Sequence, residues 1–350
     1  MAELELYDGA AALAPFGLAN LGANCYMNSL LQALVSCTAF TQAVVRHREY
    51  LAQTATGRAV YSFVDYWRGA AGVALPAGGG AGASATVLAA LGTDLAVRAP
   101  SVRFGYGQES SSEALVLLLD MMAPAGAVAP VLPSGVPSSY DSPITQLFIH
   151  RYCCTMHCRQ CGGKVSSNSD FAVNFNLFAK EFDTPVSTPA QFAEQLRNSS
   201  QEISDYACLV CKAPTSAVRQ YKLAMVPEIL FCMFNQYMGH TRHYFPLALS
   251  LPAKAGGAFD FRLVAQVEHS GTRHAGHYWA RVLRRIDAPA GAPAAASAGA
   301  SDPSHEDVCR ISDSSVGRAA FEPTTETYIA VFHIARVRPG APAASSSSAK

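Results

Sequence analysis

The sequence predicts an α+β fold in which helices come first and strands come last. The first half of the chain repeats apolar side chains at helical spacing, at Leu30, Leu31, Leu34 and Val35 and again at Leu115, Leu118, Leu119 and Met122. The last third changes to the two-residue alternation of half-buried strands, over residues 261–268, 277–283 and 328–334. With 350 residues, half of them hydrophobic, the chain is long enough to bury a large core.

Local signals separate these elements. Ser110, followed by Glu113 three residues later, forms a capping-box pattern before the second predicted helix. The Gly/Ala-rich run 69–84 and the Pro-bearing run 124–143 are predicted surface connections, because such segments bury too little apolar area to order themselves. Ala, Pro, Gly and Ser dominate two further stretches, which we expect to be a low-complexity loop over 285–308 and a disordered tail over 338–350.

Composition limits the class of function. The 26 basic side chains balance 26 acidic ones, so the charge signature of a nucleic-acid binder or a polybasic membrane binder is missing. We expect no secretory signal and no membrane insertion, because the first residues lack a basic region and the most apolar stretch, 114–119, is far shorter than the ~20 residues needed to cross a bilayer. Ten cysteines are then expected to be reduced thiols, metal ligands or a nucleophile in an intracellular protein, cytoplasmic or nuclear.

Residues 17–32, G-L-A-N-L-G-A-N-C-Y-M-N-S-L-L-Q, contain the densest signal. Cys25 lies at the start of the first predicted helix, where unpaired backbone N–H groups favour thiolate and lower the thiol pKa. Gly17 and Gly22 allow a tight backbone path before it, and the Asn20 amide could donate to a developing oxyanion. The plainer alternative is that Cys25 is a small buried hydrophobic residue.

A thiolate nucleophile needs a base, and residues 267–280 offer three histidines. We favour His277 as general base, since it begins a predicted strand beside Gly276, where a glycine allows another backbone to approach closely. His269 and His274 are then loop or structural residues. The alternative, a metal site made of the three histidines with Glu268, is less favoured, because the histidines span a turn.

These two segments resemble the cysteine and histidine boxes of the ubiquitin-specific proteases. Residues 17–32 are similar to G-L-x-N-x-G-x-T-C-Y-M-N-S-x-L-Q, with Asn24 where Thr is usual, and residues 269–280 are similar to H-S-G followed by G-H-Y. Between them, Q-E-S-S-S-E-A-L resembles the family's Q-Q-D-A-x-E-F-L, with Ser110 in place of Asp, and residues 328–332 resemble its closing Y-x-L-x-Y strand. Two strong boxes in the right order are more specific than either alone.

The resemblance implies a papain-like cysteine peptidase with a single catalytic domain over 16–337. This domain would comprise a helical thumb (16–145), zinc-bearing β fingers (146–223) and a β-sheet palm (224–337). The implied activity is hydrolysis of the isopeptide or peptide bond after the C-terminal glycine of ubiquitin. Two other classes remain: a catalytically weak ubiquitin-binding scaffold of the same fold, and a zinc-stabilised interaction module, which leaves the coexisting boxes unexplained.

The third member of the triad is open between two residues. The family motif after the histidine box places Asn or Asp where this chain has Ser312, followed by Asp313. Serine accepts a hydrogen bond from imidazole but does not stabilise imidazolium as a carboxylate does. Adjacent strand residues point to opposite faces, so we expect only one of them to contact His277, and Ser312 is the positional match.

Four cysteines predict a structural zinc site. Two C-x-x-C units, Cys158 with Cys161 and Cys208 with Cys211, are separated by 46 residues. Four thiolates at the ends of two turns give tetrahedral coordination with no open position for water. In the family that the chain resembles, such a site lies in the fingers. Cys153, Cys154 and His157 crowd the first unit and are alternative ligands.

Overall fold

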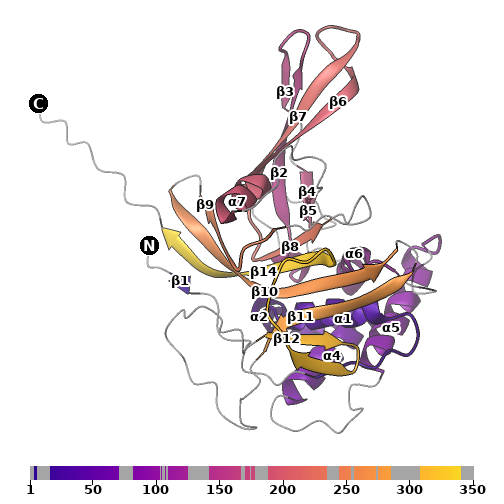
Figure 1. The fold of residues 1–350 in the computed structure, drawn as a ribbon. Helices are drawn as coiled ribbons and strands as arrows, with labels where there is room; N and C mark the ends of the chain where they lie inside the picture. Colours follow the sequence, from indigo (N-terminus) through magenta and orange to yellow (C-terminus); the bar gives the residue numbers. More distant parts are fainter. Residues whose placement is uncertain are drawn as a thin grey trace, which may run out of the picture.

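The computed structural model describes residues 4–5, 16–70, 82–102, 104, 107, 109–124, 142–166, 170–173, 175–177, 188–234, 244–253, 256–272, 275–284 and 308–339. Helices pack on one face of a large sheet, and a smaller sheet projects away from them (Figure 1). Within the described residues, no helix is long and apolar enough to cross a membrane.

The helical layer comes first in the chain. It contains α1 (Cys25–Val35), α2 (Thr38–Arg46), α3 (Arg48–Leu51), α4 (Ala55–Ala70), α5 (Ala83–Arg98) and α6 (Ser111–Met122). Every residue of α1 is buried, because the helix lies between the large sheet and the other helices. Asp94 of α5 accepts hydrogen bonds from the backbone N–H and hydroxyl of Thr56, both at 2.7 Å, and so satisfies orphan donors at the start of α4.

The large sheet has the strand order β13-β12-β11-β10-β14-β8-β5, with β1 on β14 and β9 on β10. Its strands are β1 (Leu4–Glu5), β5 (Phe175–Leu177), β8 (Ile229–Phe234), β9 (Ala248–Pro252), β10 (Gly257–Gly271), β11 (Gly276–Leu283), β12 (Val308–Ser312), β13 (Ser315–Arg318) and β14 (Thr327–Pro339). All pairs are antiparallel except β5 with β8. The predicted strands at 261–268, 277–283 and 328–334 are therefore confirmed.

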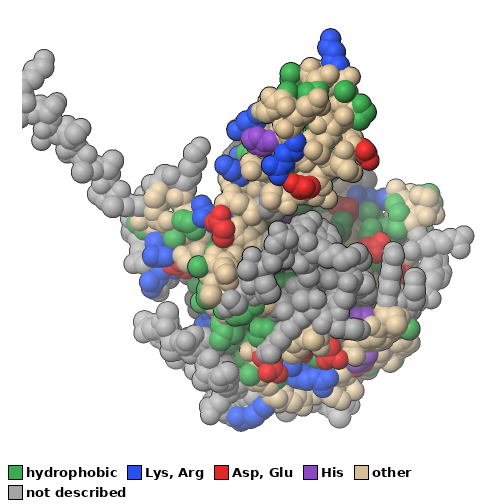
Figure 2. All heavy atoms as spheres, turned by 45° about the horizontal axis from the view of Figure 1, so that its top comes forward, with side chains coloured by type: hydrophobic (Ala, Val, Ile, Leu, Met, Phe, Trp, Pro, Cys, Tyr) green, Lys and Arg blue, Asp and Glu red, His purple; other side chains and the backbone are tan. Residues whose placement is uncertain are grey.

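The projecting sheet contains β2 (His150–Cys158), β3 (Lys164–Ser166), β4 (Asp170–Ala172), β6 (Asn198–Ala207) and β7 (Pro214–Met225). The 3₁₀ helix η3 (Thr145–Leu147) precedes it, and α7 (Pro189–Arg197) leads into β6. Thr188 starts α7 with a reciprocal capping box to Gln191. Hydrophobic side chains gather near the end of this sheet (Figure 2), where Leu209 and Val210 are exposed.

Two hydrophobic clusters cover opposite faces of the large sheet. Along β14, Ile329 and Val331 belong to the cluster under the helices, whereas Ala330 and Phe332 belong to the cluster that receives Phe192 of α7. This division follows from the two-residue period of a strand. The α+β prediction, with helices first, is confirmed.

Two predicted boundaries differ by one or two residues from the ends of the observed strands. The expected disordered tail begins two residues too early, because Arg338 and Pro339 continue β14, pair with Ala258 and Gly257, and add an ion pair from Arg338 to Asp260. The expected loop 285–308 ends one residue late, since Val308 is buried and pairs with Leu283. Residues 285–307 and 340–350 lie outside the described residues, as do 71–81 and 125–141 of the predicted surface connections.

Candidate active site and metal centre

Cys25 is the first residue of α1, and its thiol is buried against β11. The backbone of Tyr278 in β11 hydrogen-bonds to it. Burial raises the pKa of the Cys25 thiol, and backbone hydrogen bonds from Tyr278 and Tyr26 lower it by less. The prediction that the helix start makes this thiol more acidic is therefore wrong in net direction, because desolvation outweighs the N–H groups.

The segment before α1 is held by short contacts. A Cβ on Gly17 would lie 2.5 Å from backbone atoms of Ser314, so only glycine fits at this approach. Asn20 uses its side-chain oxygen locally, accepting from the N–H groups of Gly22 and Asn24. Asn24, the departure from the family pattern, accepts from the N–H of Leu21 at 3.0 Å and donates to Ser84 of α5 at 2.9 Å.

His277 and Ser312 are in contact. His277 is the second residue of β11, and its Nε2 lies 2.9 Å from Ser312 Oγ at the end of β12. Asp313 Oδ2 is 3.8 Å from the same nitrogen, too far for a hydrogen bond. Asp313 lies in the turn after β12 with a left-handed φ of 49°, a conformation that Asp adopts more readily than most residues. Ser312 is thus at hydrogen-bond distance from His277, and Asp313 is at ion-pair distance from the same nitrogen.

Asp313 instead joins the β12–β13 turn to the cysteine segment. Its carboxylate accepts from Asn28 Nδ2 at 2.7 Å and from Asn20 Nδ2 at 3.1 Å. Its backbone oxygen accepts from the N–H of Leu18 at 2.8 Å. The sequence analysis assigned no role to Asn28, although its position three residues after Cys25 places both side chains on the same side of α1.

Of the other two histidines in residues 267–280, the structure describes only His269. His269 is buried and packs against Tyr278 with ring centroids 4.3 Å apart, and burial lowers its pKa. A Cβ on Gly276 would lie 2.5 Å from His269 Nε2, so this glycine is needed beside His277. His274 lies outside the described residues. Among the described residues, no group of histidines and carboxylates is close enough to hold a metal ion.

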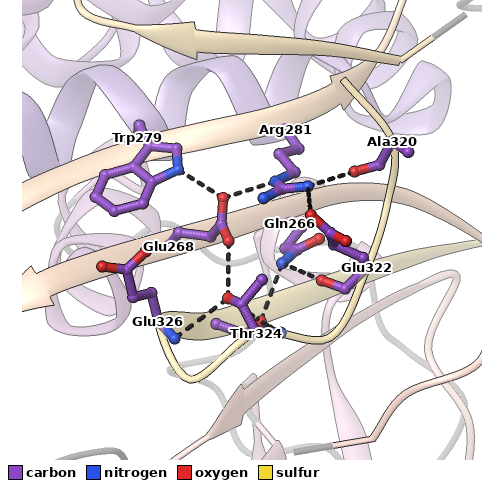
Figure 3. A network of polar contacts seen from close by, with 9 residues as sticks. Gln266, Glu268, Trp279, Arg281, Ala320, Glu322, Thr324 and Glu326 are labelled. Carbon is purple, nitrogen blue, oxygen red and sulfur yellow. Dashed lines mark hydrogen bonds and ion pairs between the residues drawn. The ribbon is translucent and has the colours of Figure 1, made fainter. Parts of the chain in front are cut away.

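A network of polar contacts occupies the sheet face beside His277 (Figure 3). Glu268 of β10 is fully buried, and its carboxylate accepts from Trp279 Nε1 at 2.5 Å, Arg281 Nε at 2.7 Å and Thr324 Oγ1 at 2.8 Å. Arg281 also binds Glu322 at 2.8 Å. Sequence reasoning weighed Glu268 only as a metal ligand and missed Trp279 and Arg281. The sequence signal that could have identified them is their spacing, because Trp279 and Arg281 lie two and four residues after His277 and so share its face of β11.

Ser110 lies where the family pattern has aspartate, and its hydroxyl makes two kinds of contact. It is the N-cap of α6, where its hydroxyl accepts from the N–H of Glu113 at 3.4 Å, as the capping pattern predicts. The same hydroxyl lies 2.7 Å from the phenol oxygen of Tyr328 in β14. The start of α6 is therefore tied to the closing strand of the sheet by neutral hydroxyls.

The four predicted cysteine ligands converge. The sulfur atoms of Cys158, Cys161, Cys208 and Cys211 all lie within 4.8 Å of one another, at the end of the projecting sheet. Backbone N–H groups point at two of them, from Gly163 to Cys161 at 3.3 Å and from Cys211 to Cys208 at 3.4 Å. Cys153, Cys154 and His157 are not members of this group.

The spacing of these sulfurs fits a tetrahedral metal ion. A Zn–S bond of about 2.3 Å implies sulfur–sulfur edges of about 3.8 Å in a tetrahedron. Two edges of the group agree with this value, from Cys158 to Cys211 at 3.8 Å and from Cys161 to Cys208 at 3.7 Å. The four cysteines therefore form a potential metal site with a closed, all-sulfur donor set.

Comparisons with known proteins agree with this geometry. Residues 16–330 match the family model of the ubiquitin carboxyl-terminal hydrolases. Two solved structures are similar in fold: the SAGA DUB module Ubp8/Sgf11/Sus1/Sgf73 bound to monoubiquitin (TM-score 0.66, 17% identity, covering 97% of this chain and 72% of the other), and the same module bound to ubiquitin aldehyde (TM-score 0.63, 15% identity, covering 97% and 72%). A yeast SAGA DUB module with a mutant Sgf73 is similar too (TM-score 0.62, 15% identity, covering 97% and 71%).

No curated protein sequence matches the chain. The family model nevertheless covers most of its length, including both boxes. The chain therefore belongs to the ubiquitin carboxyl-terminal hydrolase family and is a deubiquitinating cysteine protease with a papain-like α+β fold.

Proposed function

We propose that the protein hydrolyses the isopeptide or peptide bond after the C-terminal glycine of ubiquitin, with Cys25 as nucleophile and His277 as general base. One observation carries this assignment. His277 is the second residue of β11, and the backbone of the next residue, Tyr278, hydrogen-bonds to the Cys25 thiol, while His277 Nε2 lies 2.9 Å from Ser312 Oγ. With Nε2 donating to Ser312 Oγ, Nδ1 remains to take the thiol proton.

The chemistry proceeds in two halves. His277 Nδ1 takes the Cys25 proton as the sulfur attacks the glycine carbonyl, and the imidazolium then protonates the leaving amine, giving a thioester and the free amine. A water molecule, deprotonated by the same nitrogen, attacks the thioester. The products are the ubiquitin carboxylate and the regenerated thiol.

Asn20 is the proposed side-chain donor to the oxyanion. Its amide nitrogen carries two hydrogens, and only one of them is directed to Asp313 Oδ2, 3.1 Å away. The Asn20 oxygen is held by the N–H of Gly22 at 3.2 Å, which fixes the direction of the amide. A donor fixed in this way needs no reorganisation when charge develops on the substrate oxygen.

Ser312 and Asp313 have different proposed roles. Ser312 orients His277 through a neutral hydrogen bond. Asp313 holds Asn20 and the start of α1 through its carboxylate, which also lies 3.8 Å from His277 Nε2.

Zinc is the proposed structural metal of the four-cysteine site. Cys158, Cys161, Cys208 and Cys211 would hold it, and its contribution would be to the folding of the projecting sheet. The two turns that carry the cysteines include the left-handed residues Gly162 and Lys212, and a metal would hold these turns together. No step of the peptidase reaction involves this site.

The proposed partner is ubiquitin, alone or attached to other proteins, and the proposed location is the cytoplasm or the nucleus. The thumb (16–145), fingers (146–223) and palm (224–337) stay the proposed division of one catalytic domain. This division is supported by the change from helices to the projecting sheet and then to the strands β8–β14.

The decisive experiment treats the protein with a ubiquitin probe that ends in an electrophile. We expect a mass increase of one probe, located on Cys25 by peptide mapping. Cys25→Ala should remove the adduct and all turnover of a ubiquitin C-terminal amide while ubiquitin binding persists, because the change removes the nucleophile and little volume. Turnover by the Cys25→Ala variant would contradict the assignment, and binding without turnover in the wild type would favour the scaffold alternative.

A further inference from the structure

Besides Ser312 and Asp313, His277 has an aromatic neighbour, Trp279. His277, Trp279 and Arg281 lie on the same face of β11, because they are spaced two residues apart along the strand. The rings of His277 and Trp279 are close to parallel, with 24° between their planes and 6.0 Å between their centroids. The His277 side chain is 42% exposed, whereas Trp279 is 6% exposed. A half-exposed imidazole therefore lies against a buried indole.

A buried anion fixes the indole. Trp279 is the cross-strand partner of Glu268 on β10, and the indole N–H donates to Glu268 Oε2 (Figure 3). Arg281 donates to the same oxygen and Thr324 to the other, so both carboxylate oxygens are engaged. A buried carboxylate is stable only with such partners. The position of Glu268, and with it the plane of the indole, is therefore set by three donors.

A cation also lies over the indole. The guanidinium carbon of Arg310 on β12 is 4.9 Å from the centroid of the Trp279 ring. Arg310 and Ser312 are two residues apart on β12 and so share a face of the sheet. The strand that supplies the hydrogen bond to His277 thus also supplies a cation that packs on its aromatic neighbour.

One hydrogen bond does not fix an imidazole. The contact of Nε2 with Ser312 Oγ restrains that nitrogen, but it leaves the ring free to tilt about the N···O line. Such a tilt would move Nδ1, the nitrogen that faces the thiol in the proposed mechanism. A flat surface against the ring removes this freedom.

We propose that Trp279, anchored by Glu268, is a positioning residue that fixes the plane of the His277 ring for proton transfer with Cys25. The inference rests on the proposed role of His277 as general base. It adds a function to a buried polar network that otherwise serves only the fold of the palm.

Two substitutions at one position separate stacking from burial. Trp279→Phe keeps an aromatic face, whereas Trp279→Leu keeps only apolar volume, and both remove the N–H. We expect Trp279→Leu to lower kcat on a ubiquitin C-terminal amide by about tenfold or more with KM changed by less than about twofold, because misplacing a catalytic group costs rate and not binding. Trp279→Phe should stay within about threefold of the wild type.

A matched control is Phe321→Leu, which makes the same aromatic-to-aliphatic change at a buried residue of the same outer face. It should retain kcat within about threefold. Equal losses in Trp279→Phe and Trp279→Leu, no loss in Trp279→Leu, or a loss in KM alone would overturn the inference. Turnover in His277→Ala would overturn the proposed base and the inference together, whereas an inactive His277→Ala beside a fully active Trp279→Leu would overturn only the inference.

A second measurement needs no change at Trp279, so it stands even if those variants fold poorly. In Trp67→Phe, Trp279 is the sole tryptophan, so the emission of this variant reports on the surroundings of that indole. We expect His277→Ala to change the emission, because it removes the ring that lies against the indole, and His269→Asn to leave the emission unchanged. Unchanged emission in His277→Ala would contradict the stacking.

Discussion

Asp313 and Asn20 are predicted to act as one unit, and a double-mutant cycle tests this. Asp313→Ala removes the acceptor of Asn20 Nδ2 at 3.1 Å and of Asn28 Nδ2 at 2.7 Å. If Asn20 is the oxyanion donor, losing it costs about 10²- to 10³-fold in kcat. Releasing it by Asp313→Ala should cost a similar factor, because an unanchored amide is no longer aimed at the substrate oxygen.

The cost to folding should be small by comparison. Asn28 is buried, but its amide also donates to the carbonyls of Leu18 and Ala19 at 3.4 Å, so it keeps partners when Asp313 is truncated. We expect the free energy of unfolding to fall by about 1 kcal/mol, at the low end for a buried polar group that loses a partner. Alanine in the left-handed turn conformation adds about 1 kcal/mol. Asp313→Asn, which tolerates that conformation, is the matched control for this second term.

The assay is steady-state hydrolysis of a ubiquitin C-terminal amide by the wild type, Asn20→Ala, Asp313→Ala and the double variant. If the two residues are independent, the losses multiply to about 10⁴- to 10⁶-fold. If Asp313 acts through Asn20, the double variant loses about as much as either single variant, near 10²- to 10³-fold. A multiplicative result would refute the coupling and assign Asp313 a separate role toward His277.

Substitutions at Ser312, at the four-cysteine site and at His333 test other parts of the structure. Ser312→Ala should lower kcat by about 2- to 13-fold, the value of one neutral hydrogen bond of 0.5–1.5 kcal/mol, while Ser312→Asp should retain or raise it. Cys158→Ser should remove the one zinc per chain found by elemental analysis and lower the melting temperature. Burial holds the pKa of His333 down to about 4, so its folded pKa lies below the unfolded value of about 6.5, and stability should fall by about 1.4 kcal/mol per pH unit between these values as pH decreases. His333→Asn should flatten that slope in chemical unfolding.

The parts of the fold that sequence predicted are those with a strong period. Helix α1 and the strands β10, β11 and β14 pack against the two hydrophobic clusters, and their apolar residues recur at helical or two-residue spacing. The extension of β14 to Pro339 was missed, because it depends on pairing with Gly257, far away in sequence. The short strand β4 has too few residues to show any period.

The active site, like the fold, was predicted only in part from the sequence. Cys25, His277 and the four metal-site cysteines are recognisable from their local sequence motifs, and Ser312 is recognisable from the resemblance to the family pattern. The contacts that anchor the site were not recognisable from the sequence, since the partners of Asp313 lie 285 and 293 residues away from it. Glu268 and Trp279 interact across two strands. Only the register of β10 against β11 identifies them as a pair.

The charge of Asp313 acts on the nucleophile. It raises the pKa of the Cys25 thiol, adding to the larger effect of burial, so the thiol is favoured over the thiolate. The same carboxylate lies 3.8 Å from His277 Nε2. A buried thiol of raised pKa beside a neutral serine and a nearby anion does not favour a preformed thiolate–imidazolium pair. We therefore expect proton transfer to accompany attack on the carbonyl. The oxyanion contact from Asn20 and the orientation of the His277 ring then both affect the rate of this attack. Asp313, which anchors Asn20, and Trp279, which positions His277, should therefore affect kcat more than KM.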